Sequence, residues 1–444
     1  MSCRKGMVKF CLLGKKALFR RILLSVVSFS LCCFVSSSAL ANQNTASSPS
    51  GQFCTHQKNR RFVLPWVCQG SPQIPIINKP IRTNFVKDEI LLVYDFGTTR
   101  TAVEDVTKKY KLKRKGGMAL GALRKSVVIA DTQGQSPLDL LDAINKAETK
   151  FQASTNNYYT LADSNNSSAL GYSLTQTGVD RARAVAKGRG VVIGLVDTPV
   201  DASHPSLRGS NIEQHIVVDP RTIESKVHGT SIAGVLVSKA PQIGIAPEAK
   251  LLSVSAFSSV PGKPKVLRGK STDIVRAIAY CIRRNVDIIN LSFTGSRDKL
   301  VEQIIRAAIR KNITVVAAGG NRGRIGSTVY PAVIEGVIGV TAVDRAQRRF
   351  KYADQGRFID IAAPGVSVLT TAPNGKYQVS TGTSIAAAHI SGVMALLKSY
   401  RKDYSPNQLN STAHDLGRRG RDDAFGYGLV DAGAALRKIG APLP

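Results

Sequence analysis

The segment Gly382-Thr383-Ser384-Ile385-Ala386 opens the stretch that decides the fold, an apolar run that continues to Leu397. Gly382 allows a sharp turn, and the residues after it predict a helix with Ser384 at its mouth. A helix N-terminus offers free N–H groups and a partial positive charge, which could hold an oxyanion formed beside the serine. Ser384 is therefore a candidate nucleophile, although small residues before a helix are more often only caps.

Two further segments place a chemically useful side chain at the end of a predicted element. Residues 191–196 (VVIGLV) are a short apolar run typical of a buried parallel strand, and Asp197 follows at its C-terminal end. His228 begins the run HGTSIAG (228–234), which predicts a second small-residue helix. Taken singly, Asp197 could be a cap and His228 a structural histidine. Together with Ser384 they give the order Asp…His…Ser, one of the orders in which catalytic triads occur.

With these three residues in place, the sequence resembles the subtilase family of serine proteases. The resemblance runs from about residue 185 to 435 and rests on ordered segments. They are VVIGLVDTPVDASHPSL (191–207), HGTSIAGVL (228–236), INLSF (289–293), VVAAGGNRG (315–323), YPAVIEGVIGVTAVD (330–344), IDIAAPGV (359–366) and GTSIAAAHISGVMALL (382–397).

The resemblance implies a role for each candidate residue. Ser384 would attack the peptide carbonyl, His228 would take its proton and later protonate the leaving amine, and Asp197 would orient the imidazole. Asn321 matches the family's oxyanion-hole asparagine, acting with the N–H of Ser384. A turn residue between glycine-rich stretches is the alternative for Asn321.

The resemblance also implies where a substrate would lie. Ser292, Phe293 and Thr294 would form the strand edge that pairs with an extended peptide. Gly319 and Gly320 would line the opposite wall of the pocket for the residue before the cut bond. Because main-chain pairing carries little sequence information, broad specificity with an apolar preference is the default expectation. Phe293 could equally be an ordinary core residue.

Some residues depart from the family pattern. Thr294 stands where glycine is usual and could narrow the cleft, and Pro199 fixes φ and lacks an N–H where the family has a glycine. Ser206 replaces an aspartate that ligates calcium in many relatives, so we expect no metal there, and no cofactor is implied. The departures leave a second hypothesis open, a catalytically silent subtilase scaffold that acts as a binding protein.

The N-terminus predicts export. Its first 41 residues carry seven Lys or Arg and no acidic residue, with an apolar stretch over 22–35 and a small-residue ending at Ala41. This pattern is typical of a signal peptide cut after Ala41, so a secreted or periplasmic protein is expected. The apolar stretch is short for a membrane span, so an uncleaved anchor is the lesser alternative and no transmembrane segment is expected after cleavage.

The net charge of the chain indicates which binding partners it would attract. The chain has 444 residues, is 43% hydrophobic and carries a net charge of +31; losing the seven basic residues of the signal leaves about +24. That charge favours anionic surface polymers as partners besides protein or peptide substrates, and even suggests a basic surface-adhering protein. The alternative is solubility charge scattered over solvated faces. We find no nucleic-acid-binding signature and expect a monomer.

Three cysteines remain after signal removal. Cys54 and Cys68 lie in an irregular linker over 42–85 and could close a disulfide loop in an oxidising compartment. Cys281 lies in the helical pattern of 273–284 and is predicted to be a buried core residue.

Residues 86–162 predict a small separate domain. The pattern gives a strand, a helix, a strand, a helix and an extended end, over 90–94, 101–110, 125–130, 137–147 and 150–161. This order resembles the ferredoxin-like βαββαβ propeptide of subtilases, although the strand between the two central elements is hard to see; an unrelated α+β domain is the alternative. We expect its last segment to pair with the edge near 292–294 as a product-like inhibitor. The polar stretch that follows predicts a linker and processing region over 163–184.

Residues 185–440 predict the peptidase itself. Apolar strands over 191–196, 251–254, 286–291, 313–318 and 337–341 alternate with helical patterns, the clearest being 273–284 and 298–311. Such alternation favours a mainly parallel sheet covered by helices on both faces. The predicted fold is thus a three-layer subtilisin-like α/β domain. The predicted function is a secreted or periplasmic serine endopeptidase that acts through an acyl-enzyme and is made as an autoprocessed zymogen.

Overall fold

The computed structural model describes residues 84–161, 171–260, 263–326 and 328–443. The expected signal peptide and the stretch with Cys54 and Cys68 lie outside these residues. They comprise an N-terminal domain (residues 85–161) and a C-terminal domain (residues 171–443).

The N-terminal domain is a four-stranded antiparallel sheet with two helices. Its elements are β1 (Phe85–Asp95), α1 (Arg100–Lys109), β2 (Lys113–Leu120), the 3-10 turn η1 (Gly121–Leu123), β3 (Lys125–Asp131), α2 (Pro137–Ala147) and β4 (Phe151–Leu161). The strands lie in the order β2-β3-β1-β4. This is the predicted βαββαβ order. The strand that the sequence hides, β2, is a mostly exposed edge strand of sequence KRKGGMAL, which gives no apolar alternation.

Strand β1 is buried on both faces. Ile90 and Leu92 pack against α1 and α2, in a core that includes Ile144. Leu91 and Val93 point the other way and join the core formed around helices of the C-terminal domain. The sheet of the N-terminal domain therefore buries its second face against the C-terminal domain.

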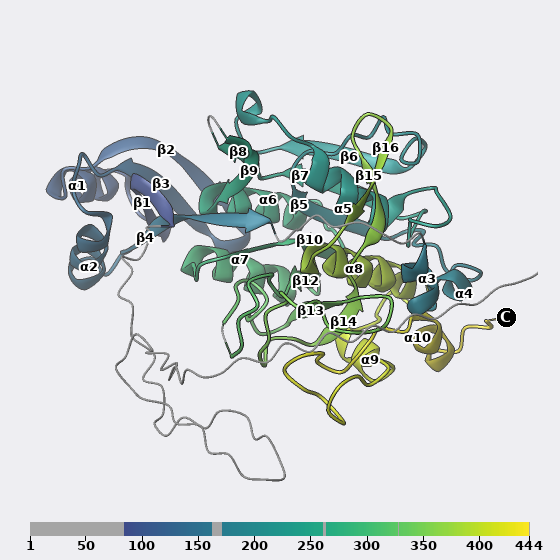
Figure 1. Ribbon diagram of the computed structural model, residues 1–444. Coiled ribbons are helices and arrows are strands. Elements are labelled where there is room, and N and C mark those ends of the chain that lie inside the picture. The colour runs from purple at the N-terminus through teal and green to yellow at the C-terminus, as the bar shows by residue number, and fades with distance from the viewer. Residues whose placement is uncertain (1–83, 162–170, 261–262, 327, 444) are drawn as a thin grey trace, which may run out of the picture. The chain divides into compact units, whose positions relative to one another are not determined.

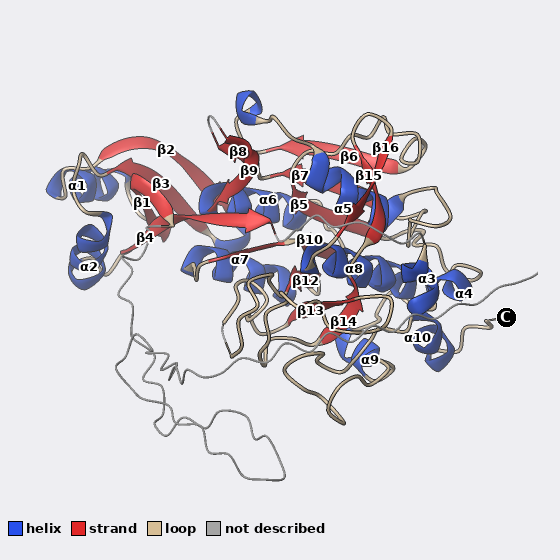
Figure 2. Cartoon of the chain, viewed as in Figure 1, coloured by secondary structure: helices blue, strands red, loops and turns tan. Residues whose placement is uncertain are grey.

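The C-terminal domain is built on a seven-stranded sheet in the order β14-β13-β12-β10-β5-β7-β6, with every neighbouring pair parallel (Figures 1 and 2). The strands are β5 (Val192–Asp197), β6 (Asn211–Ile216), β7 (Lys250–Ser255), β10 (Ile288–Leu291), β12 (Thr314–Ala318), β13 (Val337–Val343) and β14 (Ile361–Pro364). Outside this sheet lie β8 (Ser258–Val260), β9 (Lys263–Lys270), β11 (Phe293–Gly295) and the hairpin β15 (Val368–Ala372) and β16 (Lys376–Ser380). The predicted parallel sheet is confirmed.

Helices cover both faces of this sheet. They are α3 (Tyr172–Gln176), α4 (Val179–Ala182), α5 (Val227–Val237), α6 (Ser271–Arg283), α7 (Lys299–Arg310), α8 (Thr383–Tyr400), α9 (Pro406–Asn410) and α10 (Ala432–Lys438), with the 3-10 turn η2 (Pro220–Thr222). Along β12, Val316 and Ala318 face the core of α5 and α8, whereas Val315 and Ala317 face that of α6 and α7. The three-layer prediction is therefore confirmed, and Cys281 of α6 is fully buried as expected.

The start of the C-terminal domain differs from expectation. The sequence predicts a linker over 163–184, but α3 and α4 place Leu174, Val179 and Ala182 in the core shared with α8. The backbone N–H of Ala432 in α10 also donates to the Thr177 carbonyl. Two very short helices separated by glycine give no readable period in the sequence, which explains the difference.

Helix α8 runs through the middle of the C-terminal domain. Residues 383–398 of this helix are all buried. Among the residues that the structure describes, no helix has the length and apolarity needed to cross a membrane. Because residues 383–398 are buried, their polar side chains lie inside the protein, and those of Thr383 and Ser391 donate to neighbouring segments.

We predict that His389 of α8 makes the protein sensitive to acid. Burial lowers the pKa of His389 from 6.5 to about 4, against a hydrogen bond from Nδ1 to the Ile385 carbonyl that raises it. The unfolded chain therefore binds a proton between pH 6.5 and 4 that the folded chain does not, and stability falls as pH decreases through that window, by up to about 3 kcal/mol. Chemical unfolding at pH 7 and pH 4.5 measures this loss.

The variant His389→Gln should lose less stability than the wild type over the same interval. The matched control is His414→Gln, because His414 is exposed. Equal pH dependence in the wild type and His389→Gln would contradict the prediction.

Candidate active site

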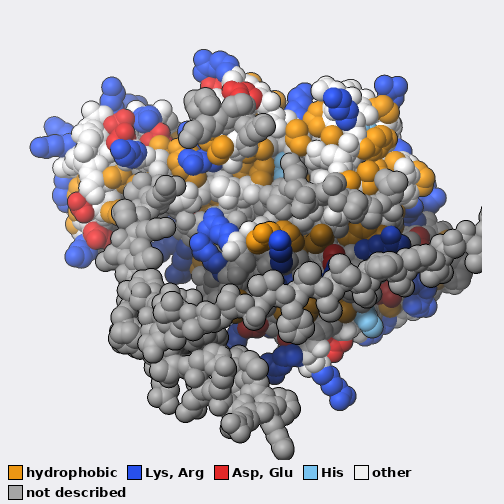
Figure 3. All heavy atoms as spheres, viewed as in Figure 1, with side chains coloured by type: hydrophobic (Ala, Val, Ile, Leu, Met, Phe, Trp, Pro, Cys, Tyr) orange, Lys and Arg blue, Asp and Glu red, His pale blue; other side chains and the backbone are white. Residues whose placement is uncertain are grey.

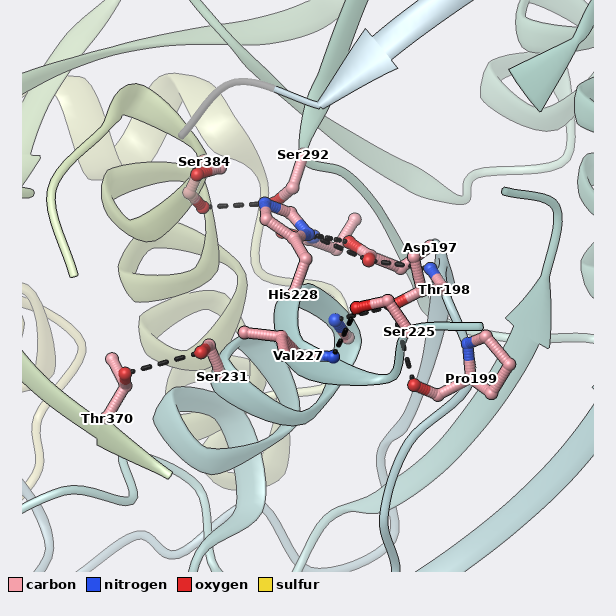
Figure 4. A network of polar contacts seen from close by, with 12 residues as sticks. Asp197, Thr198, Pro199, Ser225, Val227, His228, Ser231, Ser292, Thr370 and Ser384 are labelled. Carbon is pink, nitrogen blue, oxygen red and sulfur yellow. Dashed lines mark hydrogen bonds and ion pairs between the residues drawn. The ribbon is translucent and has the colours of Figure 1, made fainter. Parts of the chain in front are cut away.

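Three predicted residues come from three different elements and meet at one end of the parallel sheet. Asp197 is the last residue of β5, His228 is the second residue of α5, and Ser384 is the second residue of α8. Figure 4 shows the imidazole of His228 lying between the carboxylate of Asp197 and the hydroxyl of Ser384. The carboxyl end of a parallel sheet is where open α/β folds place their ligands.

The carboxylate of Asp197 holds the imidazole in place. His228 Nδ1 lies 2.7 Å from Asp197 Oδ1 and 2.8 Å from Oδ2, and both side chains are buried. Asp197 Oδ1 also accepts from the N–H of Thr198 at 2.7 Å. With Nδ1 directed at a carboxylate, the other ring nitrogen, Nε2, is the one available to accept a proton from a hydroxyl.

Close packing fixes helix α5 beside Asp197. The N–H of Gly229 donates to Thr198 Oγ1 at 2.8 Å. A Cβ at Gly229 would lie 2.3 Å from the Thr198 carbonyl oxygen and 2.9 Å from that of Pro199. The helix can approach this closely only because residue 229 is glycine. The loop with Pro199 therefore supports the Asp–His pair, and the unusual proline does not displace it.

A buried hydrogen-bond chain ties the first turn of α8 to the sheet. Ser292 Oγ donates to the carbonyl oxygen of Ser384 at 3.0 Å and accepts from Asn290 Nδ2 at 2.8 Å. Ser391 Oγ completes the chain by donating to Asn290 Oδ1 at 2.8 Å. The side chain of Ser292, predicted to border the substrate, thus positions the backbone that carries Ser384.

Thr383 organises the segment that carries Asn321. Its N–H and Oγ1 both donate to Asn321 Oδ1, at 3.1 and 2.9 Å, and its Oγ1 accepts from the N–H of Gly320 at 3.0 Å. The amide nitrogen of Asn321 is buried and has no hydrogen-bond partner among the described residues. Asn321 therefore has its acceptor side satisfied and its donor side available, which is the arrangement needed to bind an oxyanion.

Gly319 and Gly320 lie between Asn321 and the sheet. Gly319 N–H donates to the Val340 carbonyl at 2.8 Å. Gly320 has φ = 98°, and a Cβ there would lie 2.3 Å from Asp354 Oδ2. Both residues are buried, and a side chain at either would overlap its neighbours, so the close packing of this segment requires glycine.

The edge of β11 is already paired with the chain's own strand β4. The two strands are antiparallel, with Phe293 opposite Leu161, Thr294 opposite Thr160 and Gly295 opposite Tyr159. The predicted pairing of the last extended segment with this edge is therefore confirmed. On its other edge β4 pairs with β9, so the segment lies between two strands of the C-terminal domain.

Tyr159 anchors this strand. Its ring is buried and packs edge-to-face on Phe293 at 5.6 Å between centroids, and its hydroxyl donates to the Ser296 carbonyl at 3.3 Å. Phe293 is itself fully buried and also packs against Phe257. Phe293 is therefore both a core residue and the wall against which an aromatic side chain of the paired strand lies.

Two asparagine side chains of β4 also hold this strand on the C-terminal domain. Asn157 Nδ2 donates to Asp298 Oδ2 at 2.9 Å, and Asp298 caps the N-terminus of α7. Asn156 Oδ1 accepts from the N–H of Thr272 at the start of α6 at 3.3 Å. Asn156 thus accepts directly from the first turn of α6, whereas Asn157 holds the Asp298 side chain that caps α7.

The described residues contain no group of three or more His, Cys, Asp or Glu side chains placed to hold a metal ion. At the position where relatives were expected to have a calcium ligand, Ser206 Oγ contacts the Tyr377 hydroxyl at 2.5 Å.

Thr294 remains buried within the β11–β4 pairing, so its branched side chain does not prevent a strand from lying on this edge.

Comparison with known proteins identifies the class to which this geometry belongs. The model of the subtilase family matches residues 188–428. The major intracellular serine protease of Bacillus subtilis is 33% identical over 240 residues, which are 51% of this chain and 74% of that protein. Subtilisin DY of Bacillus licheniformis is 33% identical over 264 residues, or 56% of this chain and 92% of that protein. The chain therefore belongs to the subtilase family, as a subtilisin-like serine endopeptidase.

The fold likeness extends further than the sequence likeness. Fervidolysin of Fervidobacterium pennivorans, described as a keratinolytic enzyme related to subtilisin, superposes with a TM-score of 0.67 at 23% identity. The superposition covers 81% of this chain and 62% of that chain. Because the family match spans only a little over half of this chain, the shared fold must include residues outside the peptidase segment.

The sequence did not indicate the supporting residues. Thr383, Asn290 and Ser391 act through contacts between segments 60 to 100 residues apart, and a serine or threonine carries no sign of such a partner. Asn156 and Asn157 adjoin the aromatic residues of an extended segment, and only their place in a strand that meets two helix N-termini gives them a role.

We predict that Gly295→Ala loosens strand β4. A Cβ at Gly295 would lie 2.2 Å from the ring of Tyr159, an overlap worth about 1–3 kcal/mol. Hydrogen exchange of the β4 amides should accelerate by about tenfold or more, measured on protein that also carries Ser384→Ala so that the chain stays intact.

Removing the Tyr159 ring should abolish the effect of Gly295→Ala on the exchange of the β4 amides. In a Tyr159→Ala background, Gly295→Ala should change the exchange little further, whereas Gly97→Ala, where an added Cβ meets nothing within 4 Å, is the neutral control. Unchanged β4 exchange in Gly295→Ala would show that the strand is not held by this contact.

Proposed function

We propose that this protein hydrolyses peptide bonds through an acyl-enzyme, with Ser384 as nucleophile, His228 as general base and acid, and Asp197 as the group that orients the imidazole. The observation that carries the proposal is the buried Asp197–His228 pair, 2.7 Å apart, facing Ser384 at the first turn of α8. A serine hydroxyl needs an adjacent base before it can attack a carbonyl.

The steps follow from the geometry. His228 Nε2 takes the proton as Ser384 Oγ bonds to the carbonyl carbon, and the oxyanion that forms accepts hydrogen bonds from Asn321 Nδ2 and the N–H of Ser384. The imidazolium then protonates the departing amine, which leaves the acyl group on Ser384. Water, deprotonated by His228, repeats the sequence and releases the acid.

A catalytically silent scaffold remains the alternative from another class. It was suggested by Pro199 and Thr294, but both residues lie in intact structure, as the contacts around Gly229 and the β11–β4 pairing demonstrate. A fluorophosphonate probe separates the two hypotheses. An enzyme labels at Ser384 and loses labelling in His228→Ala, whereas a silent scaffold labels in neither form.

We further propose that the N-terminal domain is an inhibitory propeptide that the enzyme removes from itself. The support is the register of β4 on β11: Leu161, at the end of β4, lies opposite Phe293, the residue after Ser292, whose Oγ donates to the Ser384 carbonyl. We place the cut between about Leu161 and Thr177, where the extended segment of β4 is followed by a polar stretch of sequence. Because Leu174 and Thr177 are buried in the C-terminal domain, we place the cut in the earlier part of that interval, before Gly171.

Export and surface partners are proposals that rest on the sequence. The N-terminal pattern ending at Ala41 supports a secreted or periplasmic enzyme. On the parts of the face in Figure 3 that are not drawn in grey, Lys and Arg side chains occur in several separate places. That distribution favours general attraction to anionic polymers over a single docking site.

We predict that Ser384→Ala abolishes peptide hydrolysis while the protein stays folded. The substitution removes one oxygen from a side chain whose neighbours are held by backbone contacts, so the unfolding midpoint should change little. Asn321→Ala should lower turnover by about 100- to 1,000-fold, the size known for an oxyanion-hole asparagine of this family, with a much smaller effect on KM. Near-normal hydrolysis by purified Ser384→Ala would contradict the assignment.

We predict that maturation depends on the same serine. Wild-type protein should appear as two fragments that separate between residues 161 and 171, and Ser384→Ala as one uncut precursor. Mass spectrometry of both variants, expressed where no other protease acts, measures this. Identical fragments from both would exclude self-cleavage.

The detached domain provides an independent check. Added back to the mature enzyme, residues 86–162 should inhibit it competitively, because β4 would occupy the edge that a substrate needs. No inhibition at micromolar concentration would count against the proposed geometry.

A further inference from the structure

Beside the strand edge that receives a peptide lies a cavity of about 240 Å³. Thr294 and Gly295 of β11 line it on one side, and Val329 and Asp354 line it on another. The same two residues adjoin Gly320, since a Cβ there would lie 2.3 Å from Asp354 Oδ2 and 3.3 Å from Val329 Cγ1. The cavity therefore lies between the peptide-pairing strand and the segment that carries Asn321.

This position determines which substrate residue reaches the cavity. A peptide paired with β11 in the register of β4 runs toward Ser384, whose carbonyl oxygen is bound by Ser292. The carbonyl that Ser384 attacks must also place its oxygen near Asn321. The side chain on the same residue, the last one on the acyl side of the cut bond, then projects into the cavity.

The charged groups around the cavity are mostly positive. Arg297, Arg322 and Arg324 line it, against the single carboxylate of Asp354. Arg297 is 3.7 Å from Glu302, whereas Arg322 and Arg324 have no ion-pair partner among the described residues. The two unpaired guanidinium groups are exposed, so they are free to meet a charged side chain.

Asp354 offsets only one of these three positive charges. It is buried, and its Oδ1 already accepts from the backbone N–H of Arg324 at 2.6 Å. Its own N–H donates to the Gly320 carbonyl at 3.0 Å. The carboxylate therefore serves as a structural link between the arginine loop and the Gly320 segment.

The loop that carries the arginines is held in place. Gly323 N–H donates to the Tyr352 carbonyl at 2.7 Å, Gln355 N–H donates to the Arg324 carbonyl at 2.8 Å, and Gly326 N–H donates to the Gln355 carbonyl at 3.0 Å. These bonds fasten residues 322–326 to residues 352–355. Arg322 and Arg324 are thus presented at the cavity by fixed backbone.

We infer that this cavity selects an acidic side chain, glutamate or aspartate, on the acyl side of the cut bond, and that Arg322 and Arg324 are the specificity-determining residues. The inference rests on the proposed protease function, which it refines. It replaces the apolar preference expected from the sequence. A lysine or arginine side chain in the same place would meet like charge and be disfavoured.

The test compares peptides that differ only at this position. Active enzyme from the full-length chain is assayed on a series with Glu, its neutral isostere Gln, Leu and Lys. An exposed ion pair should raise kcat/KM for Glu over Gln by about two- to fivefold, and Lys should be the poorest substrate. Because the guanidinium groups are exposed, the ratio should fall toward one in 1 M salt.

Variants assign the effect to these residues. The double variant R322E/R324E should prefer Gln to Glu, and the milder R322Q/R324Q should cleave the two equally. R345E makes a single charge change of the same kind at an exposed arginine outside the cavity, and should keep the wild-type ratio.

The outcomes are distinct. Equal cleavage of the Glu and Gln peptides by the wild type, or the same Glu/Gln ratio in R322Q/R324Q as in R345E, would overturn the assignment of the cavity while leaving the protease function intact. Failure of the wild type to cleave any peptide of the series, including Leu, would overturn the proposed function and the cavity assignment with it.

Discussion

The burial of the first turn of α8 is the constraint on which the site depends. Ser384 can act only if its hydroxyl faces His228 while its backbone stays fixed, and α8 has no freedom because every residue from 383 to 398 is buried. Two hydrogen bonds then fix the positions of Ser384 and Asn321. Ser292 Oγ donates to the Ser384 carbonyl, and Thr383 Oγ1 donates to Asn321 Oδ1. A buried network of this kind holds catalytic groups in place without reorganisation during the reaction.

The proposed inhibition by the N-terminal domain would depend on the same rigidity. Strand β4 belongs to the N-terminal sheet through β1 and to the C-terminal domain through β9 and β11. Its docking combines main-chain pairing, the buried Tyr159 ring and the two asparagines that reach the N-termini of α6 and α7. Each contact is modest by itself, but all of them involve one rigid strand, so the entropy of ordering it is lost only once.

The sequence was sufficient to predict those elements and residues that a short local pattern identifies. Asp197 follows a continuous apolar strand, and His228 and Ser384 each open a run of small residues, so all three could be predicted, as could the parallel sheet. Strand β2 could not be predicted, because an edge strand rich in lysine and glycine has no alternation of apolar and polar residues. Helices α3 and α4 could not be predicted either, because their five and four residues span little more than one turn, too short to give a readable period.

The arginine cavity illustrates a different limit. Arg322 and Arg324 are ordinary exposed residues in sequence, and the expectation of an apolar preference followed from strand pairing alone. Their relevance arises from the bonds between residues 322–326 and 352–355 and from Asp354, which links that loop to Gly320. Strand pairing is nearly independent of sequence, so it lets the chain's own β4 and many substrates occupy the same edge. Discrimination between substrates must then come from side-chain contacts beside the edge, and charged groups on a fixed loop can supply it without altering the catalytic network.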